Sequence, residues 1–383
     1  MRIILSVIFV LIAALSNAQQ KIDLYGNKTN CQKVNLSKVA KEVTYISLET
    51  TPESLLSEEL QIYYGKDVII VGDLQTGSFF RFDKSGKFLN KIGNKGDGPE
   101  EYPSAISFYA DLSNNVYLIS PQTKSLYQYT CEGKFQRKIT FEESPWMIQK
   151  VGADFLFYNN RFNRIENKSD VKELFLADKD GKIVQSLPTT ITDNQMDMML
   201  FELPFFYRYK GKSYYKNPLL DQVYQVRTPL QLEAAYTIYT GPMVRSKNDL
   251  KNPQNLAQQI SVRNIVESDR ILLITYAYQN IFHNLMVNKS DGVCFNLRNE
   301  LPGAFVEDLA QGPDFVPYWM ASSNQDVLIS LLTEDNLEKQ SGRFKNISSS
   351  QNELANRKSG DNPILVVCLL YTSPSPRDRS LSR

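Results

Sequence analysis

The sequence predicts an all-β protein, a six-bladed β-propeller built from four-stranded antiparallel blades. A recurring turn and a strand-forming composition carry this prediction. Four strand-like runs end in polar turn residues followed by Gly86, Gly133, Gly181 and Gly292, so the steps are 47, 48 and 111 residues, the last close to two periods. Repeats of about this length among strands are typical of propeller blades. The chain contains 21 Tyr and 20 Phe, residues that favour half-buried strands.

Each period divides into four strand candidates, which alternate apolar and polar residues and are separated by turn formers. In chain order the five units visible in this way are residues 60–64, 67–71, 78–82 and 87–92; 104–111, 115–120, 124–129 and 134–139; 146–151, 155–158, 173–177 and 182–185; 205–207, 213–215, 222–226 and 232–239; and 260–266, 271–276, 282–287 and 293–297.

A sixth blade is expected from the two ends of the repeat. Residues 318–322, 327–332 and 363–367 supply three strands, and residues 43–48 alternate well enough to supply the missing outer strand. A ring closed by strands from both chain ends leaves no exposed sheet edge. Two connections depart from the strand pattern: residues 252–259 begin like a helix, and residues 333–358 are polar and either helical or loose.

The N-terminal sequence has the pattern of an export signal. Residues 1–18 combine a short basic start, an apolar run too short to span a bilayer as a helix, and a small-residue cleavage site. The first cysteine is Cys31, so no lipoprotein signal is present. We expect signal cleavage, a lead segment over residues 19–42, a propeller over residues 43–367, no transmembrane segment after cleavage, and a periplasmic or extracellular location.

The C-terminus differs in character from the rest of the chain. Residues 368–383 resemble the translated sequencing-adapter tail that ends unrelated chains, and a disordered tail rich in Ser, Pro and Arg is the alternative. We expect the residues beyond about Tyr371 to pack on nothing.

The charge composition gives no indication of a nucleic-acid partner. The formal net charge is +1, from 43 basic and 42 acidic residues, and no block of five or more Lys or Arg occurs. Nucleic acid is therefore not an expected partner.

The four cysteines fit no spacing pattern, which leaves both free thiols and a single disulfide open. We expect a monomer.

A glycine-rich segment at residues 92–102, the strand at 43–50, the turn at 82–88 and the closing segment at 361–366 together resemble an exported six-bladed β-propeller family abundant in gut Bacteroidota. The blades resemble the NHL-repeat type. This resemblance implies a location in the periplasm or envelope. It implies no established activity, and it carries no catalytic motif onto this chain. Many members of that family have a lipoprotein signal, which this chain lacks.

Two loops offer candidate ligand-binding residues. Glycines at 93, 96 and 98 are followed by Pro and Glu rather than Lys and Ser, so the segment is a crossover between blades and not a phosphate loop. Crossovers lie where propeller ligands often bind. A long polar loop at residues 159–168 either recognises a partner or is a solvated insertion. The candidate residues are Asp97, Glu100, Glu101, Tyr102, Arg161 and Arg164.

The residue inventory favours binding over catalysis. His283 is the only histidine, and no nucleophile motif or metal-ligand spacing occurs. We predict no catalytic residue, metal or cofactor, and a non-enzymatic exported binding module. Its ligand is a carbohydrate, a peptide or a partner protein of the cell envelope, bound on the face that carries the inter-blade loops. The alternative is a carboxylate- or metal-dependent hydrolase or lyase at the central channel.

Overall fold

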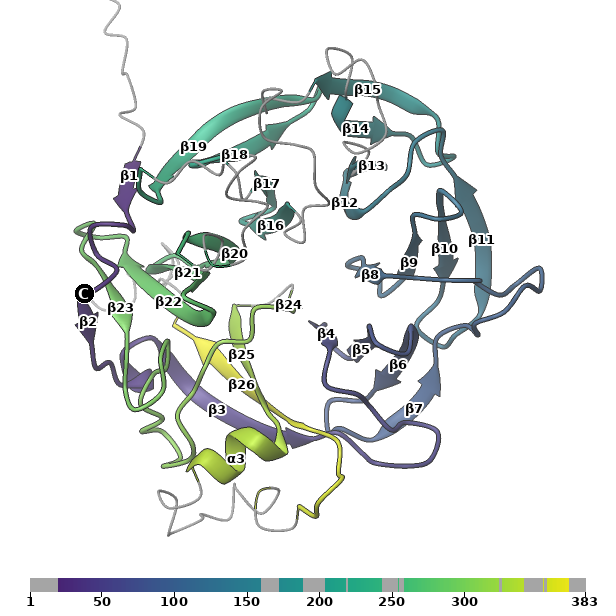
Figure 1. The fold of residues 1–383 in the computed structure, drawn as a ribbon. Coiled ribbons are helices and arrows are strands. Elements are labelled where there is room, and N and C mark those ends of the chain that lie inside the picture. The colour runs from purple at the N-terminus through teal and green to yellow at the C-terminus, as the bar shows by residue number, and fades with distance from the viewer. Residues whose placement is uncertain are drawn as a thin grey trace, which may run out of the picture.

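The computed structural model describes residues 20–159, 172–188, 204–217, 220–242, 258–323, 326–340 and 357–371, together with Gln254 and Leu354. Six β-sheets stand around a central axis like the blades of a propeller (Figure 1). The predicted fold class is confirmed. The sheets are numbered here as blades in the order in which the chain enters their inner strands.

Strand bounds follow the predicted units closely. Blades one to three are β4 (Leu60–Tyr64), β5 (Ile69–Asp73), β6 (Ser78–Phe82) and β7 (Phe88–Lys91); β8 (Ser107–Ala110), β9 (Val116–Ser120), β10 (Ser125–Tyr129) and β11 (Phe135–Thr140); and β12 (Met147–Val151), β13 (Asp154–Tyr158), β14 (Lys172–Ala177) and β15 (Ile183–Pro188). Blades four and five contain β16 (Phe205–Tyr209), β17 (Lys212–Lys216), β18 (Gln222–Arg227) and β19 (Gln231–Tyr239); and β20 (Ser261–Glu267), β21 (Ile271–Tyr278), β22 (Ile281–Asn288) and β23 (Cys294–Leu297).

The two ends of the chain close the ring in the sixth blade. This sheet has the order β25 (Val327–Leu332), β26 (Ile364–Leu370) and β3 (Ala40–Ser47). Val366 pairs with Tyr45 in the antiparallel register between β26 and β3. The predicted closure by strands from both ends is therefore confirmed. β26 continues through Cys368 to Leu370, and both of these side chains are buried.

One predicted strand pairs differently. We placed residues 318–322 in the sixth blade, but β24 (Ala321–Ser323) pairs in parallel with β4 of the first blade. Only the beginning of this segment pairs with β25: the Tyr318 N–H donates to the carbonyl of Ile329 at 2.8 Å. The chain then passes from blade six to blade one, where the Tyr318 hydroxyl donates to the carbonyl of Leu60 at 2.6 Å. β4 thus gains a neighbour on its channel side.

The lead segment forms an outer strap. β1 (Gln20–Asp23) adds to blade four in parallel with β19, and β2 (Cys31–Gln32) adds to blade five in parallel with β23. A short 3-10 helix, η1 (Leu36–Lys38), precedes β3. Ile22, Leu24 and Leu36 of this strap are buried against the blades. These outer strands were not predicted, because parallel pairs of two to four residues leave no alternation to read.

The polar connection in blade six contains the helix α3 (Glu334–Gln340). Most of the predicted helix start at 252–259 lies outside the described residues. In the part of the chain that the structure describes, no helix is both long and apolar enough to cross a membrane.

The repeated glycines make the contacts that hold neighbouring blades together. Gly86, Gly133 and Gly181 have φ values of 90°, 84° and 91°. A β-carbon at any of them would collide with a backbone carbonyl oxygen in the preceding blade, that of Ser47, Lys91 and Thr140 respectively. Gly292 also has a positive φ, of 73°, but nothing lies within 4 Å of its β-carbon position. The turn therefore recurs because it serves close blade packing as well as a left-handed backbone.

Candidate functional site

Blade topology defines two faces of the ring. In each four-stranded meander, the turn between the two middle strands and the crossover to the next blade share one end, which we call the crossover face. The turn after each innermost strand lies at the other end, which we call the mouth face. Innermost strands run from the crossover face to the mouth face, so their final residues gather around the central axis at the mouth face.

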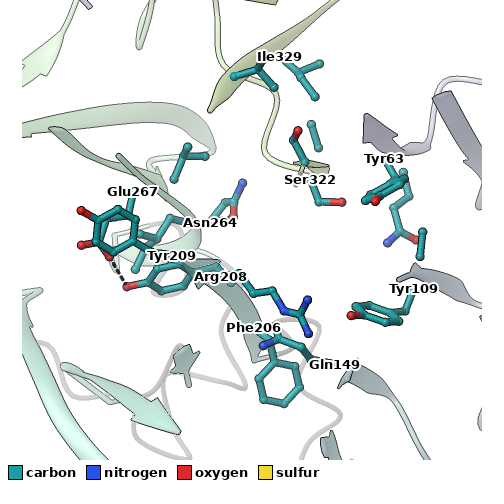
Figure 2. A pocket seen from close by; sticks show the side chains of 18 of the residues that line it. Tyr63, Tyr109, Gln149, Phe206, Arg208, Tyr209, Asn264, Glu267, Ser322 and Ile329 are labelled. Carbon is teal, nitrogen blue, oxygen red and sulfur yellow. Dashed lines mark hydrogen bonds between the residues drawn. The ribbon is translucent and has the colours of Figure 1, made fainter. Parts of the chain in front are cut away.

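A cavity of about 460 Å³ opens in the central channel. All six blades contribute to its wall, from their inner strands and from neighbouring turns (Figure 2). Its aromatic and polar lining includes Gln61, Tyr63, Tyr109, Gln149, Phe206, Arg208, Tyr209, Lys210, Asn264, Glu267, Ser322 and Asp326. Because it draws on every blade, this site exists only once the ring is closed.

Arg208 provides a cation in this cavity. It lies on β16, is exposed, and extends into the cavity toward Tyr109 (Figure 2). One guanidinium nitrogen donates a hydrogen bond to the backbone carbonyl of Lys150 in blade three. Arg208 makes no ion pair with any of the described residues, so its charge is not neutralised by a carboxylate there.

Gln149 lies on β12 beside this cation. It is 4% exposed, and its buried side-chain nitrogen has no hydrogen-bond partner among the described residues. Gln61 on β4 shows the alternative: its amide nitrogen donates to the Phe108 carbonyl at 2.9 Å, and its oxygen accepts from the Phe108 N–H at 3.0 Å. Gln61 thus joins two blades, whereas Gln149 leaves an amide donor unused at the cavity wall.

Two tyrosines face Arg208 across the channel, Tyr63 from blade one and Tyr109 from blade two. The pKa of Tyr63 is raised to about 12, chiefly by burial and also by nearby Tyr109 and Asp111, while Arg208 acts in the opposite direction. Burial likewise raises the pKa of Tyr109, opposed by Arg208 and by the Lys150 backbone. Both phenols are therefore protonated at neutral pH and able to donate.

In the part of the wall formed by blades four and five, the charged groups are paired with other protein groups. The Glu267 carboxylate accepts hydrogen bonds from Tyr236 at 2.6 Å and from Tyr207 at 3.2 Å, and it pairs with Lys289 at 2.8 Å. Its side chain is fully buried. Lys210 at the mouth pairs with Asp269 at 2.7 Å. These groups stiffen the joint between blades four and five and leave no free carboxylate at Glu267 for acid–base chemistry.

The predicted rim residues lie elsewhere, on the crossover face. Asp97 and Glu100 are exposed, and the Glu101 carboxylate accepts the Gly98 N–H at 3.0 Å within its own loop. Tyr102 is buried and donates from its hydroxyl to the Gly77 carbonyl at 3.1 Å. None of these four lines the channel cavity. Arg161 and Arg164 lie outside the described residues.

Other reactive side chains stay apart from the cavity. His283 stacks on Tyr276 with ring centroids 5.2 Å apart, and burial lowers its pKa. Cys31, Cys131, Cys294 and Cys368 are all described, and all are free thiols. Within the described ranges, no group of three or more His, Cys, Asp or Glu side chains is arranged to hold a metal ion.

The sequence matches the family model described as "Domain of unknown function (DUF4934)" over residues 19–368. The chain belongs to the DUF4934 family. No curated protein matches it in sequence.

Two of the similar solved structures show the same fold as this DUF4934 chain. One is a protein of Bacteroides fragilis described as exported, with 17% identity and a TM-score of 0.69, covering 92% of this chain and 99% of that one. Another is a member of the DUF4221 family from Bacteroides vulgatus, with 11% identity and a TM-score of 0.54, covering 88% of this chain and 98% of that one. Virginiamycin B lyase from Staphylococcus aureus has 10% identity and a TM-score of 0.43, covering 76% of this chain and 81% of that one.

Sequence reasoning missed the channel residues of the DUF4934 chain. Arg208 and Gln149 each lie in a short inner strand, with no motif around them. One signal could have found them: both are polar residues within predicted inner strands, which border the central channel of a propeller.

Proposed function

We propose that this protein is an exported, non-enzymatic binding module that holds a small polar ligand in the mouth of its central channel. The observation that carries the proposal is the cavity of about 460 Å³, to which all six blades contribute. Small-ligand sites commonly measure about 300–1,000 Å³ and combine an aromatic wall with a few directed polar groups. Tyr63, Tyr109 and Phe206 supply that wall, and Gln149 and Arg208 supply the polar groups.

The side-chain chemistry supports binding rather than turnover. A hydrolase or lyase at this site would need a general base or a nucleophile in reach of the ligand. The cavity carboxylate best placed by burial, Glu267, is held by three donors. Asp326 is the other carboxylate of the lining, and the Tyr63 and Tyr109 hydroxyls that face Arg208 stay protonated at neutral pH. Such groups orient a ligand without activating it. Export is proposed from the signal pattern of residues 1–18.

A second surface on the crossover face could bind a carbohydrate. Phe282 of β22 and Trp319, just before β24, stack with centroids 5.7 Å apart and planes 18° apart. Phe282 is 41% exposed. A stacked aromatic pair open to solvent suits the apolar face of a sugar ring. This surface belongs to the same face as the candidate residues Asp97 and Glu100, and replacing Phe282 and Trp319 together with Ala would abolish glycan binding there.

The channel proposal is tested with protein beginning at residue 19. It is mixed with envelope extract and with libraries of sugars and short peptides, and the bound compounds are identified by native mass spectrometry. Ser322→Trp fills the cavity mouth, whereas Ser290→Trp places the same side chain in an exposed turn of blade five.

We expect the compound to be lost from Ser322→Trp and retained by Ser290→Trp, with no chemical change in the compound. Equal retention by both variants, or absence of any bound compound from the unmodified protein, would contradict a channel site. Conversion of the compound would favour the enzymatic alternative.

A further inference from the structure

We infer that the channel ligand carries a carboxylate, and that Arg208, Gln149 and Tyr109 form its recognition site. This inference rests on the proposed channel-binding function and specifies the chemical class of its ligand. The three side chains come from blades four, three and two and line the same cavity.

The positive charge of Arg208 is the first reason. Asp111, in the turn after the inner strand of blade two, already interacts with Lys150 at 3.4 Å, Asn115 at 3.1 Å and Tyr117 at 3.2 Å. Glu267 is held by its own donors, and Asp326, the other carboxylate of the lining, forms no ion pair with Arg208 among the described residues. A planar guanidinium is suited to paired hydrogen bonds with a carboxylate.

The unused amide of Gln149 is the second and independent reason. A polar atom buried without a partner destabilises the fold unless something else satisfies it. Gln149 is almost fully buried and lines the cavity, and its inaccessible side-chain nitrogen has no partner among the described residues. Gln61, on the inner strand of blade one, has both amide atoms satisfied by the next blade. When the Gln149 side chain turns toward the cavity, a ligand oxygen supplies the partner that its nitrogen lacks.

The hydroxyl of Tyr109 completes the set. Burial keeps this phenol protonated at neutral pH, so it can donate to an anion rather than repel it. Figure 2 shows Arg208 directed toward Tyr109 across the cavity. One guanidinium and two neutral donors balance a single negative charge. That charge fits a carboxylate monoanion better than a phosphate, which carries closer to two charges at neutral pH.

The test compares matched probes by isothermal titration calorimetry: glucuronate and galacturonate as sugar acids, glucose and galactose as their neutral counterparts, and inorganic phosphate. The variants are Arg208→Gln and Gln149→Leu. Arg137→Gln is the control, because Arg137 is an exposed arginine on the outer strand of blade two. Thermal melting of each variant checks that the fold is intact.

We expect the sugar acids to bind at least ten times more tightly than the neutral sugars and than phosphate. Loss of a hydrogen bond to a charged group typically weakens binding about 10-fold or more, so Arg208→Gln should lose that preference and Gln149→Leu should reduce it. Arg137→Gln should bind as the unmodified protein does. Should Arg208→Gln fail to fold, Gln149→Leu alone decides the matter.

Tighter binding of neutral sugars or phosphate, or a preference for acids that survives in both variants, would overturn the inference. The channel-binding proposal would then stand if Ser322→Trp still abolished binding of the preferred probe. Binding of every probe unaffected by Ser322→Trp would instead remove both.

Discussion

The backbone carbonyl of Ser47 occupies the space that a β-carbon on Gly86 would need. Ser47 ends the outer strand of blade six, and Gly86 lies in the last turn of blade one, so this contact joins the two ends of the ring. The backbone is bonded here as well, because the Glu49 N–H donates to the Gly86 carbonyl at 2.8 Å. Gly133 and Gly181 repeat the relationship with Lys91 and Thr140.

Gly86→Ala should therefore destabilise the protein far more than Gly292→Ala. Both positions have a positive φ, which costs an alanine about 1–2 kcal/mol, but only Gly86 has a backbone atom in the way. We expect a loss of about 3 kcal/mol or more for Gly86→Ala, since packed blades must separate. Urea unfolding of the two variants measures the difference. Equal losses would show that only the backbone conformation matters.

Removal of strands from the N-terminus should act in two stages. Deletion of residues 20–38 removes β1, β2 and η1, and with them the buried Ile22, Leu24 and Leu36, so the protein should remain folded but melt at a lower temperature. Deletion of residues 20–50 also removes β3 and exposes the edge of β26. Cooperative melting should then be lost. A sharp transition in the longer deletion would contradict closure by β3.

The glycine turns made the fold predictable, because a period near fifty residues appears in the sequence itself. The closing pair of β3 and β26 was also predictable, since both strands alternate or are wholly apolar. The pairing of β24 with β4 was not. It depends on Tyr318, whose N–H donates to Ile329 of blade six and whose hydroxyl donates to Leu60 of blade one. Nor could the cavity be predicted, because Arg208 and Gln149 meet only when blades three and four stand side by side.

Stability should rise with pH above neutrality because of Lys216. This side chain is fully buried and donates to the carbonyls of Asn217 and Leu220, and burial lowers its pKa to about 7 from 10.5. Between those values the unfolded chain binds a proton that the folded chain does not. The free energy of unfolding therefore increases with pH in this window, by up to about 1.4 kcal/mol per pH unit.

Lys216→Met should flatten this dependence, whereas Lys212→Met, at an exposed position of the same strand, should preserve it. The free energies of unfolding are compared by urea unfolding at about pH 7, 8 and 9. These pH values lie between the folded and the ordinary pKa of Lys216. Lys84, whose pKa burial lowers to about 8, contributes equally to both variants. Identical slopes for the two variants would rule out a neutral Lys216 in the folded protein.

The burial of β26 predicts how far the C-terminus can be shortened before the fold loses stability. Cys368 and Leu370 are 0% and 2% exposed, and the Leu370 N–H donates to the Asp326 carbonyl at 2.8 Å. The Tyr371 N–H donates to the carbonyl of Val39 at 3.0 Å.

A chain that ends after Tyr371 should melt at the same temperature as the full chain, because we expect the residues beyond it to pack on nothing. A chain that ends after Val367 should lose about 3 kcal/mol or more, since two buried side chains and their strand pairs are removed. Differential scanning calorimetry of the three chains distinguishes these outcomes, and a lower melting temperature for the chain ending at Tyr371 would show that the tail packs against the propeller.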